Sequence, residues 1–151
     1  MLSHFRKSYD EKDRGFTLIE LLVVMIIIGI LAAIAIPVYV NQRKLAEDVA
    51  AKSDVATLGK ELHSYYIDGT AVPTITIVGG NYTLKYGSPV VTKTFGKASK
   101  NVVLRVYSPS KIKSGTNWCV SVNNPKGDRS LLAKGGFSFS STAGLTNAAC
   151  P

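Results

Sequence analysis

The feature that most constrains the fold is an unbroken apolar stretch near the N-terminus. Sixteen consecutive residues, from Leu21 to Ile36, carry no polar or charged side chain, and apolar residues dominate the wider segment Phe16–Val40. At about 1.5 Å of rise per residue, a helix over this segment is roughly 37 Å long, whereas the hydrocarbon core of a bilayer is about 30 Å thick. The stretch therefore predicts a membrane-spanning helix.

A short motif precedes this stretch and places an acid just inside it. The motif is Arg14-Gly15-Phe16-Thr17-Leu18-Ile19-Glu20. Thr17 and Glu20 have the spacing of a capping box, which satisfies free amides at a helix start, and a plain signal anchor could use the same device. A plain anchor gains nothing, however, from an acid in apolar surroundings, which costs about 2.5 kcal/mol or more deep in a membrane. The position of Glu20 therefore indicates a partner charge.

The motif and the helix after it resemble those of type IV prepilins, in which a glycine and a phenylalanine precede Thr-Leu-Ile-Glu. The match runs from about Lys12 to Gln42 and does not cover the C-terminal region. The resemblance implies that a prepilin peptidase cleaves after Gly15 and N-methylates Phe16. It also implies a helical homopolymer in which Glu20 meets the free amine of a neighbouring subunit. An inner-membrane assembly platform and a cytoplasmic ATPase would build that polymer.

Gly29 and Pro37 lie inside the apolar stretch, where each weakens a helix. Glycine costs about 1 kcal/mol relative to alanine, and proline removes an amide donor. The resemblance makes both of them assembly positions and implies that Ile30–Ile36 partly unwinds when subunits pack. The alternative is that the two residues only tilt or bend the anchor.

Charge and composition predict how the chain is organised across the membrane. Residues 1–15 are polar and lack the apolar core of a conventional secretory signal. Basic residues are more numerous before the span than just after it, where Arg43 and Lys44 follow, so the positive-inside rule places the leader in the cytoplasm. We expect a single-pass cell-membrane protein with its head outside, which then enters an extracellular pilus. The expected parts are a cleaved leader at 1–15, a transmembrane and assembly helix at 16–40, an amphipathic helix at 41–69 and a head domain at 70–151.

The amphipathic pattern of Asn41–Asp68 predicts a helix that buries one side against a sheet. Asp68-Gly69 is expected to end it, before Pro73. The expected apolar side consists of Leu45, Val49, Val55, Ala56, Gly59, Leu62 and Tyr66, and the expected solvent side consists of Arg43, Glu47, Asp54 and Glu61.

Beyond Pro73 the periodicity changes from helical to alternating, and the composition becomes rich in Thr, Val, Tyr, Ser and Gly. This predicts an α+β fold, with a long N-terminal helix packed on a small antiparallel β-sheet head, as the resemblance to type IV pilins also implies. Gly79-Gly80-Asn81 is a plausible hairpin turn. The expected strands are Thr74–Val78, Tyr82–Tyr86, Val90–Phe95, Asn101–Tyr107, Thr116–Asn123, Arg129–Ala133 and Phe137–Ser140.

Cys119 and Cys150 lie in the region expected outside the cell, where a pair of cysteines is more often a disulfide than two free thiols. Such a bridge would close a C-terminal loop and stabilise the head by roughly 3 to 4 kcal/mol. Many type IV pilins bridge a C-terminal loop in a similar arrangement. Two cysteines without a nearby histidine do not furnish a zinc site, so we expect no metal and no cofactor.

The head carries few groups that could do acid–base chemistry. Asp128 is the only acid beyond Asp68, and the only histidines of the chain are His4 and His63. No carboxylate pair, no serine with a nearby histidine and no phosphate-binding glycine loop is present, so an enzyme is not expected. The shortage of acids also disfavours the calcium site that major type II secretion pseudopilins commonly hold.

The head is instead basic, with ten Lys or Arg beyond Asp68. Such a surface attracts DNA or other anionic surfaces, although lysines also simply keep a polymer soluble. The candidate DNA- or anion-binding residues are Lys111, Lys113, Lys126 and Arg129. The favoured function is a structural subunit of a type IV pilus, serving adhesion, twitching motility or DNA uptake. The alternatives are a type II secretion pseudopilin and a membrane-tethered module that binds DNA or other anions.

Overall fold

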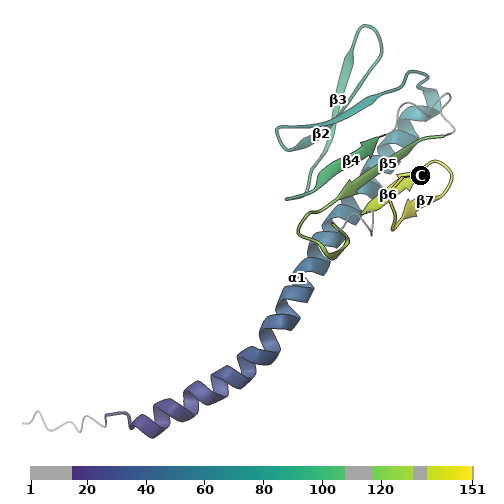
Figure 1. Ribbon diagram of the computed structural model, residues 1–151. Helices are drawn as coiled ribbons and strands as arrows, with labels where there is room; N and C mark the ends of the chain where they lie inside the picture. Colours follow the sequence, from purple (N-terminus) through teal and green to yellow (C-terminus); the bar gives the residue numbers. More distant parts are fainter. Residues whose placement is uncertain (1–14, 108–116, 131–135, 151) are drawn as a thin grey trace, which may run out of the picture. The chain divides into compact units, whose positions relative to one another are not determined.

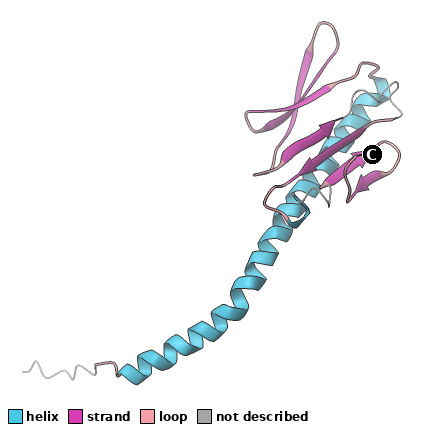
Figure 2. Ribbon diagram, in the orientation of Figure 1, coloured by secondary structure: helices cyan, strands magenta, loops and turns pink. Residues whose placement is uncertain are grey.

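The computed structural model describes residues 15–107, 117–130 and 136–150. One long helix, α1 (Leu18–Asp68), is followed by a head built of short strands (Figures 1 and 2). The chain divides into two compact units, with the boundary between Tyr39 and Val40. The N-terminal unit contains the apolar part of α1, and α1 is continuous through both Gly29 and Pro37. Partial unwinding of this part on assembly stays a prediction.

The second unit packs the C-terminal part of α1 on two antiparallel sheets, as Figure 2 shows. The expected α+β fold is therefore confirmed, with two sheets in place of one. In chain order, the first sheet contains β1 (Thr74–Val78), β2 (Asn81–Tyr86) and β3 (Val91–Lys97), and the second contains β4 (Val103–Tyr107), β5 (Cys119–Asn123), β6 (Phe137–Ser140) and β7 (Gly144–Thr146).

Alternating side chains of the strands meet the helix in one hydrophobic core. Within the first sheet Ile75 lies opposite Leu84, and within the second Val120 lies opposite Phe139. Because successive side chains of a strand point to opposite faces, this register puts the apolar residues on the helix side. The buried core consists of Ala51, Val55, Leu58, Leu62, Ile75, Tyr82, Leu84, Phe95, Val102, Trp118, Val120, Val122 and Phe137.

The predicted strands are largely confirmed. The exceptions are the first two residues of one expected strand, which are not extended, and one short strand that was not expected. A 3₁₀ turn occupies Asp128–Ser130, at the start of the region expected as the strand Arg129–Ala133; residues 131–135 lie outside the described residues. This turn is held by a carboxylate from α1, a contact that local pattern does not reveal. The short strand β7 was not predicted, since three residues give too little alternation to recognise.

The expected apolar side of the amphipathic helix was partly wrong. Leu45 and Val49 are 60% and 65% exposed, whereas Asp54, expected in solvent, is only 7% exposed. The face that packs on the sheets has Ala51, Val55, Leu58 and Leu62 at its centre, at spacings of four, three and four residues. Two buried acids on or beside this face, Asp48 and Asp54, displace the apparent hydrophobic stripe toward the opposite side of the helix.

Gly59 allows the helix and the second sheet to approach closely. A Cβ at this position would overlap the ring of Phe139. The same ring stacks on Trp118, with 5.9 Å between ring centroids, and Tyr66 of α1 stacks on Trp118 at 6.1 Å. The glycine thus makes room for an aromatic layer that joins α1 to β5 and β6.

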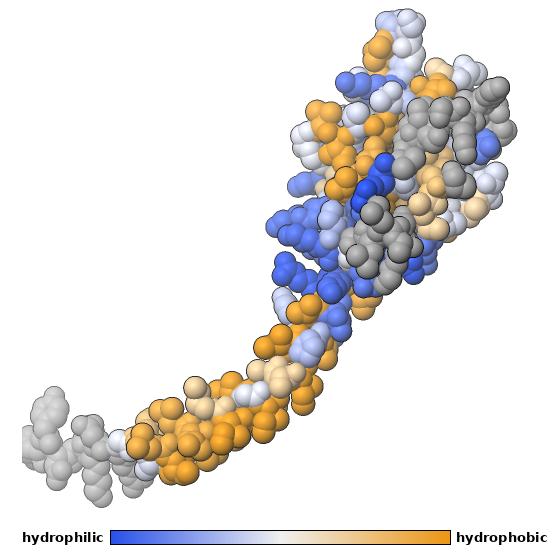
Figure 3. Space-filling model, viewed as in Figure 1, coloured by the Kyte–Doolittle hydropathy of each residue, from blue (hydrophilic) through white to orange (hydrophobic). Residues whose placement is uncertain are grey.

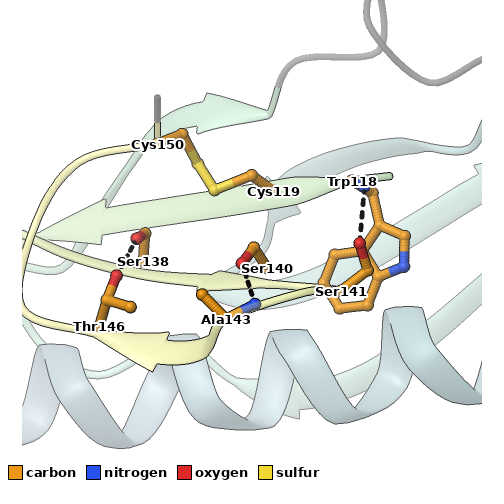
Figure 4. Close-up of a disulfide and its surroundings, with 8 residues drawn as sticks. All are labelled: Trp118, Cys119, Ser138, Ser140, Ser141, Ala143, Thr146 and Cys150. Atoms are coloured by element: carbon orange, nitrogen blue, oxygen red, sulfur yellow. Dashed lines mark hydrogen bonds between the residues drawn. A yellow bond between two sulfur atoms is a disulfide. The ribbon is translucent and has the colours of Figure 1, made fainter. Parts of the chain in front are cut away.

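The disulfide between Cys119 and Cys150 is present and ties the C-terminus to β5 (Figure 4). Hydrogen bonds hold the loop that it closes. The hydroxyl groups of Ser138 and Thr146 lie 2.7 Å apart, and the amide of Ala143 donates to Oγ of Ser140 at 3.0 Å. The loop is therefore fixed by both covalent and polar contacts.

Candidate functional site

The start of α1 contains a complete capping box. The amide of Thr17 donates to Oε2 of Glu20 at 2.8 Å, and the Thr17 hydroxyl donates to the same oxygen at 2.9 Å. In return the Glu20 amide donates to Oγ1 of Thr17 at 3.2 Å. These bonds satisfy amide groups that a helix start leaves free. Both contacts to the carboxylate use Oε2.

The bond between Gly15 and Phe16 lies just outside the helix. Residues 15–17 have no regular secondary structure, α1 begins at Leu18, and both residues of this bond are exposed. A peptidase needs an accessible, non-helical peptide, because helical hydrogen bonds would have to break before the chain could enter an active site. This location meets that requirement.

The apolar part of α1 has no protein neighbours in the described chain. Every large hydrophobic side chain from Phe16 to Val40 is exposed, from 43% to 91%. Figure 3 shows hydrophobic residues over almost the whole visible face of this part. By length and composition α1 is able to cross a membrane. Such a surface requires lipid or other protein chains around it, because contiguous exposed apolar area of this extent is not stable in water.

Gly29 and Pro37 both lie within the continuous helix α1. A Cβ at Gly29 would meet nothing within 4 Å, so nothing in a single chain demands glycine there. Pro37 lies within α1. An assembly role for either residue therefore depends on neighbouring subunits and stays a proposal.

Three acids of α1 fasten loops of the head, a role that the sequence pattern did not indicate. Asp54 accepts hydrogen bonds from the Tyr82 hydroxyl, the Ser99 amide and the Ser99 hydroxyl, each at 2.8 Å. Burial, and then the bond to Asp54, raises the pKa of Tyr82 far above its ordinary value. The tyrosine therefore stays protonated and remains a donor.

Asp48 and Glu47 hold the loop after β5. Asp48 accepts from the amides of Asp128 and Arg129, both at 3.1 Å. Oε2 of Glu47 accepts from Nδ2 of Asn124 at 2.6 Å. This hydrogen bond is the main cause of a lowered pKa for Glu47. The one available hint in the sequence is that acids gather on the helix while the head, rich in amide donors, has almost none.

Of the four candidate DNA- or anion-binding residues, the structure describes Lys126 and Arg129. Lys111 and Lys113 lie outside the described residues. Arg129 donates to the Asn147 carbonyl at 3.0 Å, and its guanidinium lies 5.8 Å from the centre of the Phe137 ring. Lys126 is exposed. Their joint role stays a prediction.

The described residues offer little for catalysis or metal binding. They contain no group of three or more His, Cys, Asp or Glu side chains that could hold a metal ion. His63 lies at the edge of an open cavity of about 420 Å³. The other residues that line this cavity are Lys60, Ser64, Ile67, Phe139, Ser140, Ser141 and Gly144, none of which is an acid.

Comparison with known proteins identifies a family motif in the N-terminal segment. Residues 11–36 match the family model for the prokaryotic N-terminal methylation motif. The type II secretion system core protein G of Escherichia coli strain K12 is 39% identical over 64 residues, 42% of this chain and 44% of that protein. Core protein G of Pseudomonas aeruginosa is 40% identical over 62 residues, 41% and 44% of the two chains. That of Dickeya chrysanthemi is 35% identical over 65 residues, 43% and 42%.

These matches cover less than half the length of the curated relatives. No solved structure matches the chain. The family-model match includes the capping box and much of the exposed apolar helix, and no catalytic family is indicated. The chain carries the N-terminal methylation motif of prokaryotic prepilin-like proteins, and less than half of its length is homologous to type II secretion core protein G.

Proposed function

We propose that this chain is a structural subunit of a type IV pilus that polymerises through α1. The observation that carries the proposal is the arrangement at residues 15–20. A non-helical, exposed peptide bond at Gly15–Phe16 stands next to a capped acid, which opens a helix whose apolar surface has no cover in a single chain. Adhesion, twitching motility or DNA uptake would then be the work of the assembled fibre.

In this proposal the capping box is the state before assembly. The amide of Thr17 keeps Glu20 engaged while Phe16 is still in a peptide bond. Cleavage by a prepilin peptidase gives Phe16 a charged amine, which is then N-methylated. A neighbouring subunit's carboxylate offsets that charge in apolar surroundings, where an unpaired ion is costly. Glu20 thus fixes the axial position of one helix against the next.

The proposed topology follows from the same segment. Residues 1–15 form a cytoplasmic leader, 16–40 span the membrane until assembly, 41–69 carry the head, and 70–151 form the head outside. An assembly platform and an ATPase would move the subunit from lipid into the fibre.

Substitution of Glu20 tests the polymer. Glu20→Ala should leave the protein inserted in the membrane but greatly reduce the yield of sheared fibres. Glu61→Ala is the matched control, because it removes an acid of the same helix that pairs with Lys93 at the surface, at 3.1 Å. Fibre yield unchanged by Glu20→Ala would refute the assembly role of Glu20. Absence of the unsubstituted chain from sheared fibres, with its head held at the membrane, would refute the polymer and favour the tethered binding module.

Substitution of Gly15 tests the processing site separately. Gly15→Leu places a bulky side chain before the proposed cut, and a Cβ there meets nothing in the chain itself, so folding should be unaffected. The variant should insert normally and keep the mobility of the uncleaved precursor. If Gly15→Leu instead migrates like the cleaved, unsubstituted protein, cleavage after Gly15 is rejected.

A type II secretion pseudopilus is the second candidate, because the curated relatives that match part of the chain are named type II secretion core protein G. The shortage of acids in the head was expected to disfavour this alternative, and the comparisons give it more weight. Deletion of the chain separates the two. Loss of surface fibres with normal secretion supports the pilus, whereas loss of secretion with fibres intact supports the pseudopilus.

A further inference from the structure

Basic residues gather where α1 enters the head. The predicted span ends at Val40, and the exposed side chains of Arg43 and Lys44 follow within one turn. At about 1.5 Å per residue, they lie about 5 Å farther along the helix axis, and Glu47 lies about 10 Å beyond Val40. Any charge held beside Glu47 is therefore close to the membrane surface.

Asn124 holds two lysines of the head beside Glu47. Its Nδ2 donates to Oε2 of Glu47 at 2.6 Å and to the Lys100 carbonyl at 3.3 Å, and its Oδ1 accepts from the Lys126 amide at 3.1 Å. Asn124 is only 1% exposed, whereas the side chains of Lys100 and Lys126 are exposed. A buried clamp thus fixes two loops and leaves their lysines facing outward.

Two of these bases lie near the same carboxylate. Lys126 and Arg43 each help to lower the pKa of Glu47, after the larger effect of Asn124, so both lie within electrostatic reach of the same carboxylate. We call Arg43, Lys44, Lys100 and Lys126 the basic collar. Figure 3 shows hydrophilic residues gathered over this end of the head.

The acids of this region are largely directed inward. Asp48 is only 6% exposed and accepts from two amides of the loop after β5, and Glu47 is half-buried and bonded to Asn124. Asp128 is an exposed acid on that loop. The outward-facing charge of the collar is therefore mainly positive.

We propose that the basic collar docks on the anionic phospholipid headgroups of the membrane that holds the subunit before assembly. This proposal rests on the anchor proposed above. Attraction to an anionic surface falls off within a Debye length of about 8 Å, and the collar begins well inside that distance from the span. Each docked base contributes about 1 kcal/mol, which raises the affinity of the head for the membrane surface about fivefold.

Docking restricts the head to one tilt above the bilayer and keeps its bases out of solution until the helix is extracted. Nucleic acid is the competing anionic ligand. The bilayer beside the collar would, however, block much of the access of a nucleic acid to these bases. The closeness of these bases to the end of the span therefore favours lipid.

Lysine footprinting on the full chain tests the collar. The protein is reconstituted in vesicles of phosphatidylcholine alone or with about one third phosphatidylglycerol, and acetylation rates of individual lysines are measured by mass spectrometry. Lys44, Lys100 and Lys126 should react about fivefold more slowly in the anionic vesicles, and high salt should remove the difference. Lys60 and Lys85, which are exposed and remote from the collar, are internal controls.

A variant pair tests whether the collar acts as a unit. Arg43→Gln with Lys126→Gln should restore the reactivity of Lys44 and Lys100 in anionic vesicles. Lys60→Gln with Lys85→Gln changes the net charge equally and should not restore it. Neither pair removes a core side chain.

Several results would overturn the proposal. These are equal reactivity in the two vesicles, uniform protection of all lysines, and equal effects of the two variant pairs. Protection of the same lysines by short duplex DNA, without protection by anionic vesicles, would assign the collar to nucleic acid. Failure of the protein to float with either vesicle would refute the anchor itself and the collar with it, whereas floatation with equal reactivity refutes the collar alone.

Discussion

The buried carboxylate of Asp54 should be a main support of the head, and Asp54→Ala tests this. The substitution removes three hydrogen bonds of 2.8 Å and leaves the Tyr82 hydroxyl, in a side chain only 1% exposed, without its acceptor. A hydrogen bond to a charged group contributes about 1.5 to 3 kcal/mol, and a buried donor left unpaired costs about 1 to 3 kcal/mol. Ser99 is half-buried, so water can replace part of its loss. We expect Asp54→Ala to lower the free energy of unfolding by about 3 kcal/mol.

The assay is urea unfolding of the full chain in detergent, followed by tryptophan fluorescence. Trp118 is the only tryptophan and is buried between Tyr66 and Phe139, so its emission reports the head. Asp68→Ala is the matched control, since Asp68 is exposed at the end of α1, and it should change stability by less than about 0.5 kcal/mol. A loss below about 1 kcal/mol for Asp54→Ala, with the control unchanged, would refute the reasoning.

Three further predictions follow from the same contacts. Because the folded-state pKa of Glu47 is lowered, its contribution to stability is present above its ordinary pKa of 4.5 and is lost as pH falls through the folded value; Glu47→Gln should flatten acid unfolding curves in that window. Gly59→Ala should destabilise by about 1 kcal/mol, because overlap with Phe139 outweighs the gain of about 1 kcal/mol in helix propensity; a stabilised variant in urea would contradict this. Replacing Cys119 and Cys150, 31 residues apart, by serine should cost about 3 to 4 kcal/mol in non-reducing urea titrations, and an unchanged midpoint would show that the loop is held without the bridge.

Local patterns predicted the elements of this fold because each element has a strong local cause. Sixteen consecutive apolar residues predict a helix long and apolar enough to span a membrane. The alternation of polar and apolar residues in Thr74–Val78 predicts a strand with the observed bounds. The capping box at Thr17 and Glu20 is likewise local, since its partners are three residues apart. The disulfide could be predicted because the sequence has two cysteines and both lie in the region expected outside the cell.

The long-range polar contacts could not be predicted, and they account for some of the errors. Asp54 was expected in solvent because it is an acid, and its hydrogen-bond partner Ser99, 45 residues away, cannot be recognised from the local sequence. Arg129 and Ser130 were expected in a strand but lie in the 3₁₀ turn Asp128–Ser130, whose contact with Asp48, 80 residues earlier, is not visible in the local sequence. Leu45 and Val49 were expected in the core because hydropathy alone does not say which apolar side of a helix meets a sheet.

The hydrogen bonds of Asn124 are a further set of long-range contacts that local sequence does not reveal. Nothing in the sequence near Asn124 distinguishes it from an ordinary turn residue in Asn124-Pro125-Lys126-Gly127-Asp128. Only the fold brings it to Glu47, and only then do Lys100 and Lys126 join the bases that follow the span.

The most direct test of the central claim is the intact mass of the protein recovered from sheared surface fibres. The account predicts a single species that begins at Phe16, carries one methyl group on its N-terminus and contains the disulfide between Cys119 and Cys150. A mass that retains the first fifteen residues, in protein found only as single chains in the membrane, would contradict it.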